Sequence, residues 1–206
     1  MKTTVALLLA FLVNHTFGAD YCPTSGKGGA YFTTHATHTE LDCEEHYWDE
    51  SDEIKEYHFH VYFWPKNPVS VADALRLRDN LVSSVSRGDF VAVCEGVNST
   101  VLPGLAEDAR VPSIDYEPMG PHPVGNYEIW VPQEYLGKVT SLMMLNRGEN
   151  TLLFHPKSYH CVEDHTGRVM WMGVPFNLDR SALNFEGPEC SVPQYTELGL
   201  GYSAPE

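Results

Sequence analysis

The segment at residues 57–63 (YHFHVYF) constrains the fold more than any other stretch of the chain. Side chains of a β-strand alternate between its two faces, so its apolar residues are expected on one face and His58 and His60 on the other. One face can then pack in a core while the other presents two metal-capable nitrogens. An isolated His-x-His pair is also explained by a half-exposed strand whose histidines bond to solvent. Other segments of the sequence have to distinguish this explanation from a metal site.

The first 19 residues have the layout of a secretory signal peptide. Lys2 precedes an apolar run over residues 5–13, and the small residues Gly18 and Ala19 suit a cleavage site. The run is too short to span a bilayer. The sequence Asn98-Ser99-Thr100 is an N-glycosylation sequon, which has meaning only in a eukaryotic secretory pathway. We therefore expect a secreted protein.

The chain is strongly acidic, with 28 acidic against 13 basic residues and a net charge of −15. Loss of Lys2 with the signal peptide would make the net charge −16. This charge repels phosphate groups, which argues against nucleic acids and anionic membranes as partners.

The five cysteines follow no zinc-finger spacing. Because disulfides are expected in an oxidising compartment, we predict bridges that involve Cys22 and Cys43 near the N-terminus and Cys161 and Cys190 near the C-terminus. Cys94 lies in a predicted strand and is expected to be a buried thiol.

Three regions follow one another along the chain. Residues 1–19 form the signal peptide, and residues 20–54 are predicted to be an irregular extension because they lack periodicity. Three histidines of this extension, His35, His38 and His46, are explained more simply as solvated loop residues than as a second metal cluster. Residues 55–206 are predicted to form one domain.

The predicted elements of this domain alternate in a recognisable order. Strands are expected at residues 57–63, 89–95, 126–131 and 151–155. One helix starts with a capping box at Ser70 and Asp73 and ends at Arg87-Gly88, and another spans 133–146. The order predicts an α+β fold, a ferredoxin-like sandwich (βαββαβ). We expect the first and third strands to be central and parallel, the fourth to be antiparallel beside the first, and the C-terminal segment to cover the open sheet face.

Polar residues gather on the sheet face opposite the predicted helices. Strand alternation places His58, His60, Glu128 and His155 on this face, and His122 precedes the third strand at the same edge. Burying these groups without partners would be costly, and a divalent metal would supply the partner. Two or three imidazoles with one carboxylate suit non-haem iron(II), and the same set would accept zinc.

His165 lies in the segment that has to cover the open face. It is a candidate acid/base group above the metal, although a loop histidine bonded to Asp164 or to backbone is an equally simple explanation. The aromatic residues Tyr62, Trp64, Trp130 and Trp171 are candidates to line an aromatic ring, and core packing explains such residues as well.

Four segments together resemble the DOPA 4,5-dioxygenase family of extradiol ring-cleaving enzymes. They are YHFHVYF, GPHPVGNYEIWVP, LLFHP and DHTGRVMWMG, and their order and spacing match over residues 55–180. The resemblance implies a ferredoxin-like fold, a homodimer, and cleavage of DOPA or a related catechol by O₂. It also implies iron(II) as the cofactor, with zinc or copper as alternatives.

The resemblance assigns roles to individual residues. It implies that His60, His122, His155 and Glu128 bind the metal and that His165 and His58 are catalytic; the choice between His58 and His60 as ligand stays open. Iron(II) oxidises readily outside cells, so a secreted zinc- or copper-binding protein of the same fold without ring-cleaving activity is the alternative.

Overall fold

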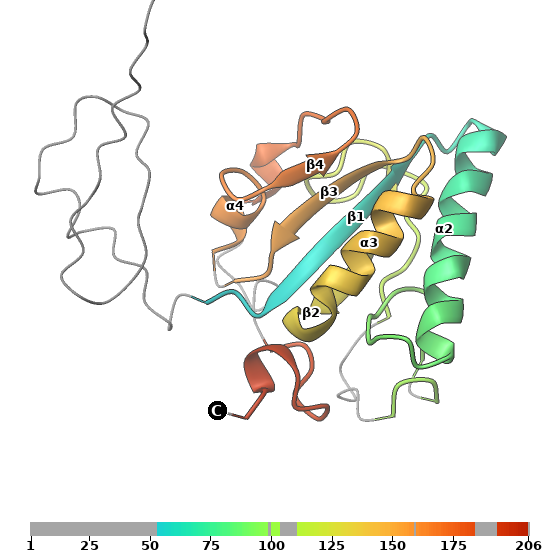
Figure 1. The fold of residues 1–206 in the computed structure, drawn as a ribbon. Coiled ribbons are helices and arrows are strands. Elements are labelled where there is room, and N and C mark those ends of the chain that lie inside the picture. The colour runs from blue at the N-terminus through green and yellow to red at the C-terminus, as the bar shows by residue number, and fades with distance from the viewer. Residues whose placement is uncertain (1–52, 99, 104–110, 159, 184–192, 206) are drawn as a thin grey trace, which may run out of the picture. The chain divides into compact units, whose positions relative to one another are not determined.

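The computed structural model describes residues 53–98, 100–103, 111–158, 160–183 and 193–205. In this part of the chain, one four-stranded sheet carries two helices on one face (Figure 1). The predictions for residues 1–52 lie outside the described residues. Cys190 lies outside them as well, whereas Cys161 is disulfide-bonded.

The sheet is antiparallel throughout its described strands. β1 (Glu56–Phe63) pairs with β2 (Gly125–Pro132) on one side and with β3 (Thr151–Pro156) on the other. β4 (Met170–Met172) pairs with the outer side of β3, so the strand order is β2-β1-β3-β4. β1 is therefore central, as predicted.

The predicted parallel pairing of the first and third strands was wrong. In each strand-helix-strand unit the two strands are parallel to each other. The predicted second strand (residues 89–95), however, pairs in antiparallel fashion with the predicted third strand, which is β2. Val93 forms an isolated antiparallel bridge with Trp130 of β2, which shows this arrangement. The third strand must therefore run antiparallel to the first. The spatial order of the elements still follows the ferredoxin-like sandwich, so the α+β fold prediction is confirmed.

The predicted second strand at residues 89–95 is reduced to this single bridge. Val93 exchanges both backbone hydrogen bonds with Trp130, at 3.0 and 2.9 Å. The chain turns directly afterwards at Glu95 and Gly96, where Gly96 has a φ of 93°, so the ladder cannot continue. Cys94 in this segment is free and buried, as predicted.

The first helix, α2 (Pro68–Ser86), begins two residues earlier than the predicted capping box. The side-chain oxygen of Asn67 accepts hydrogen bonds from the backbone amides of Val69 and Ser70. Proline at the first helical position is favoured because its missing N–H would have no partner there. The Ser70 hydroxyl instead accepts from the backbone amide of Trp64.

The second helix follows the prediction closely. A 3₁₀ turn, η2 (Gln133–Tyr135), leads into α3 (Leu136–Asn146). Val139 and Met143 are fully buried against the sheet, as their helical spacing predicts. They join a core between the helices and the sheet that includes Phe59 and Val61 of β1.

The opposite sheet face is contacted by His165 and Phe176 of the downstream chain. The downstream chain also contains the short helices α4 (Cys161–Asp164), η3 (Arg180–Leu183) and η5 (Gly201–Ser203). Part of this region, β4, extends the sheet as an edge strand, which the sequence did not predict. None of the helices in the described ranges is both long and apolar enough to cross a membrane.

The start of α2 can be tested by substitution. We expect Asn67→Ala to lower the free energy of unfolding by about 1 kcal/mol, because two amide groups lose their acceptor. Asp73→Asn removes the other end of the predicted capping box and should cost less than about 0.5 kcal/mol, since the partner of Asp73 in the described part of the chain is the exposed Arg76. Urea unfolding of both variants measures the difference, and a larger loss for Asp73→Asn would contradict this helix start.

Candidate metal centre

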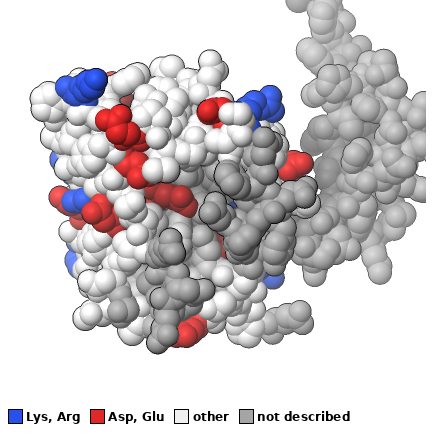
Figure 2. Space-filling model, turned by 180° about the vertical axis from the view of Figure 1, so that it is seen from behind, with Lys and Arg blue, Asp and Glu red and all other residues white. Residues whose placement is uncertain are grey.

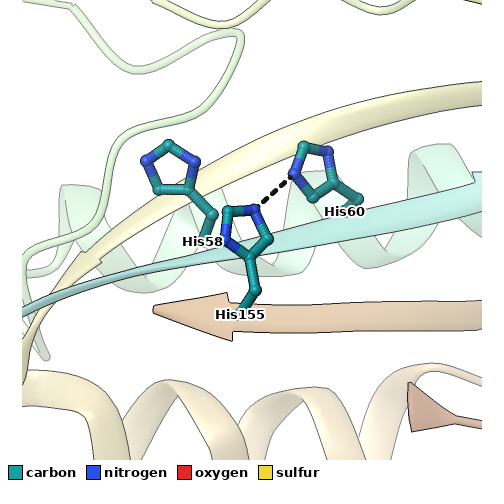
Figure 3. Close-up of side chains that lie close together, drawn as sticks. All are labelled: His58, His60 and His155. Atoms are coloured by element: carbon teal, nitrogen blue, oxygen red, sulfur yellow. Dashed lines mark hydrogen bonds between the residues drawn. The ribbon is translucent and has the colours of Figure 1, made fainter. Parts of the chain in front are cut away.

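Five histidines from distant parts of the chain meet on the open sheet face. His58 and His60 project from β1 and His155 from β3, and His58 lies directly across from His155 in the strand register (Figure 3). His122 lies in a tight turn closed by paired backbone hydrogen bonds with Met119. The remaining member, His165, follows α4.

His60 lies at the centre of this cluster. Its ring centroid is 4.0 Å from that of His122, 5.2 Å from that of His155 and 6.0 Å from that of His165. The rings of His155 and His165 are 4.1 Å apart. The Nε2 atoms of His60 and His155 approach to 3.1 Å, the contact drawn in Figure 3.

Two overlapping groups of these histidines could hold a metal ion. One consists of His58, His60 and His155, and the other of His60, His122 and His165, with the ligand nitrogens of each group within 4.8 Å of one another. His60 is the member shared by both groups. Four of the five histidines, His58, His60, His122 and His155, are buried.

Neighbouring groups orient several of these rings. His155 Nδ1 donates to the Pro156 carbonyl at 2.6 Å, and His165 Nδ1 donates to the Cys161 carbonyl at 2.9 Å. A carbonyl oxygen only accepts, so in each neutral ring Nε2 carries the lone pair. His122 Nδ1 lies 2.7 Å from the Tyr62 hydroxyl. Such hydrogen bonds on the second ring nitrogen are typical of metal-binding histidines.

The surroundings keep four of the imidazoles neutral. Burial and repulsion by the neighbouring histidines lower the pKa of His60, His155 and His165, and lower that of His122 to about 3. A neutral imidazole is the form that binds a metal. Among the described residues, His60 Nδ1 is buried without a hydrogen-bond partner, which is costly for a polar atom. Nitrogens of neutral imidazoles that converge within 4.8 Å of one another form a donor set that fits a metal.

Glu128 makes its close contact with His58. Its Oε1 atom lies 2.6 Å from His58 Nδ1 and accepts from the indole N–H of Trp130 at 2.5 Å. Burial alone would raise the pKa of Glu128, but attraction to His58 and these two hydrogen bonds outweigh it and lower the pKa to about 2. Glu128 belongs to neither of the two groups that could hold a metal. It is therefore a charged partner that orients His58.

Aromatic side chains lie beside the cluster. The Tyr62 ring is 5.8 Å from Trp171 and 5.1 Å from Phe176, between their centroids. Trp130 stacks on the His58 ring at 5.9 Å. Trp64 is half exposed and contacts Phe176 edge-on. Three of the predicted aromatic residues are thus joined by Phe176, which sequence reasoning missed.

Comparisons with known proteins place this geometry in a family. The model of the Dopa 4,5-dioxygenase family matches residues 57–182, the stretch that contains all five clustered histidines. The chain belongs to the Dopa 4,5-dioxygenase family. This membership supports an oxygenase activity.

Individual relatives of the family differ in how much of the chain they match. A DOPA 4,5-dioxygenase from Amanita muscaria is 37% identical over 172 residues, which cover 84% of this chain and 67% of the relative. An uncharacterized 21.2 kDa protein from Botryotinia fuckeliana is 35% identical over 76 residues, 32% of this chain and 41% of that protein. A crystal structure from Nostoc punctiforme, proposed to be a dioxygenase, is 26% identical and covers 66% of this chain and 96% of its own, with a TM-score of 0.49.

For this member of the Dopa 4,5-dioxygenase family, the structure brings all the predicted site residues to one place. His60, His122 and His155 lie together, His165 joins them, and Glu128 contacts His58 at the edge of the cluster. Sequence reasoning missed Gln194, whose side chain contacts His58 Nε2. No local pattern around residue 194 could have shown this contact, because it joins positions 136 residues apart.

The lowered histidine pKa values predict acid sensitivity of the metal-free protein. Unfolded histidines take up protons near pH 6.5, whereas these folded ones do not, so stability is greatest above pH 6.5 and is lost progressively as the pH falls from 6.5 toward the lower pKa values of the folded state. We expect the free energy of unfolding in EDTA to fall between pH 7 and pH 5 by up to about 1.4 kcal/mol per pH unit for each buried histidine.

Chemical denaturation at several pH values measures this slope. His122→Gln should make the slope shallower by up to one proton, whereas the control His160→Gln, at an exposed histidine, should leave it unchanged. Equal slopes in wild type and His122→Gln would contradict the buried neutral state.

Proposed function

We propose that this protein is a non-haem, metal-dependent extradiol dioxygenase that cleaves the ring of DOPA or a related catechol with O₂. The observation that carries the proposal is the cluster of buried neutral imidazoles centred on His60, in a chain of the Dopa 4,5-dioxygenase family. Catechols bind metals through both oxygens, and a metal held by three protein ligands has coordination positions open for them.

The metal would be held by His60 together with members of its two groups. Ligand nitrogens about 2.1 Å from one ion are about 3 Å apart when they occupy neighbouring positions, and the Nε2 atoms of His60 and His155 are 3.1 Å apart. His122 shares the other group with His60. We propose iron(II) as the native metal, while imidazole donors also suit zinc and copper. When bound, the metal supplies a Lewis acid and a redox centre for catechol and O₂.

His58 is the candidate acid/base group with the best-defined environment. Charged Glu128 accepts the Nδ1 hydrogen of His58, which orients the ring and leaves the lone pair of the neutral imidazole on Nε2. A base of this kind can take a proton from a catechol hydroxyl. His165 is a second candidate to donate or accept a proton, although it also belongs to one metal group.

The aromatic residues would hold the catechol ring. Tyr62, Trp171 and Phe176 contact one another beside His122, and the Tyr62 hydroxyl bonds directly to that histidine. Offset stacking against such side chains stabilises a flat aromatic ligand. This arrangement supports an aromatic substrate rather than an aliphatic one.

We also propose that the protein is a secreted homodimer without nucleic acid or membrane partners. Residues 1–19 have the layout of a signal peptide, Asn98 of the glycosylation sequon is exposed, and Cys161 is disulfide-bonded. Figure 2 shows acidic side chains across the middle of the rear face and basic ones at its margins. This surface supports the exclusion of polyanionic partners.

Metal loading and oxygen uptake test the proposal together. After anaerobic loading with iron(II), the wild type should consume O₂ with DOPA and form a yellow ring-opened product. His60→Ala should lose both metal retention and O₂ uptake, because His60 belongs to both ligand groups. His160→Ala, at an exposed histidine, serves as the matched control. Tight zinc or copper binding without O₂ uptake would instead support a secreted metal-binding protein.

The acid/base candidates are separated from the ligands by metal analysis. We expect His58→Gln and His165→Ala to retain metal while turnover falls about 10²- to 10⁴-fold, the usual contribution of a positioned proton-transfer group. Metal content by elemental analysis and kcat with DOPA are the two measurements. Metal loss in either variant would reassign that histidine as a ligand, and unchanged turnover would remove it from the mechanism.

A further inference from the structure

The C-terminal segment, residues 193–205, reaches the candidate metal centre although it lies outside the residues that match the family model. It is fixed to the start of β1 by Glu56, a fully buried carboxylate. Both carboxylate oxygens of Glu56 accept from the backbone amide of Gln194, at 3.0 and 2.9 Å, and one accepts from that of Tyr202 at 3.4 Å. A buried carboxyl group held by backbone amides makes a specific anchor.

The rest of the segment is equally constrained. Tyr195, the residue after Gln194, is fully buried in the core. Gly201 has a φ of +59°, and a Cβ atom there would lie 2.6 Å from Glu56 Cγ, so only glycine fits. The backbone amide of Gly201 also donates to the Glu134 carboxylate. The backbone of residue 194 is therefore held by Glu56 and by the burial of Tyr195.

The Gln194 side chain extends from this anchored backbone to His58. Its amide atoms lie 3.1 and 2.9 Å from His58 Nε2. Because Glu128 accepts the hydrogen on His58 Nδ1, the Gln194 amide can donate its N–H to Nε2 of the neutral ring, and its Oε1 can accept from Nε2–H after that nitrogen has taken up a proton. Trp130 stacks on the face of the same ring. The His58 ring is thus held at both nitrogens and on one face.

We propose that Gln194 is a positioning residue of the active site, which fixes the ring orientation of His58, so that the C-terminal segment completes the site. The proposal rests on the proposed function in treating His58 as a reacting group. An imidazole held only by Glu128 can still tilt about that single hydrogen bond, and losing such a supporting contact typically costs 10- to 100-fold in activity.

The test compares Gln194→Met with the wild type in the full chain. Methionine keeps the length and flexibility of the side chain but removes the amide. We expect kcat with DOPA to fall about 10- to 100-fold, KM to change less than about twofold, and metal content to stay the same. Glu197→Gln, at an exposed position of the same segment, is the matched control and should match the wild type.

A second readout does not depend on activity. In histidine-labelled, metal-free protein, the ¹⁵N signal of His58 Nε2 should shift in Gln194→Met relative to the wild type, because that nitrogen loses its amide partner. Gln194→Asn, which keeps the amide but is one methylene too short, should behave like Gln194→Met and provides a milder variant if the first one unfolds.

Two results would overturn the role of Gln194. One is a kcat in Gln194→Met equal to that of the wild type, and the other is an unchanged His58 spectrum in both variants. If the wild type itself consumes no O₂ with DOPA, the proposed function fails, whereas the spectra still decide whether Gln194 fixes His58.

Discussion

The antiparallel pairing of β1 with both of its neighbours is the constraint on which the rest of the structure depends. This pairing puts His58 opposite His155 on one side and opposite Trp130 on the other, and it puts His60 opposite Glu128. A slip of one residue would turn every one of these side chains toward the helices. Burial of Phe59 and Val61 on the other face prevents that slip, so the packing of the core also aligns the histidines.

The cluster places polar atoms where a folded protein ordinarily places apolar ones. Burial and mutual repulsion keep His60, His122, His155 and His165 neutral, which lowers the stability of the metal-free protein at acidic pH. A metal that binds the folded state would repay this cost by mass action. In such a site, metal binding and folding stability are linked.

The two sides of the site differ in chemical character. His60, His122 and His155 are neutral nitrogen donors, whereas His58 lies between a charged carboxylate and an amide. The first arrangement suits a cation, and the second suits proton transfer. His58 and His60 of the same strand therefore suit different roles, proton transfer and metal binding, because the neighbouring strands present different side chains to each of them.

Much of this arrangement follows from local pattern. Alternation in β1 and β3 predicted which side chains face the helices, and helical spacing predicted that Val139 and Met143 are buried, because both patterns depend only on backbone periodicity. The parallel pairing and the second strand were predicted incorrectly. Strand direction depends on how successive units meet, and a ladder continues only when the chain does not turn, as it does at Gly96.

By itself, the sequence determined the element order, the two faces of the sheet and the set of histidines that share the open face, since each follows from short-range geometry. The tertiary structure alone decided that Glu128 orients His58, that His165 joins the histidine cluster and that Gln194 reaches across 136 residues to the same ring. Such contacts depend on the path of the loops and on the burial of Glu56 and Tyr195, which no local pattern encodes.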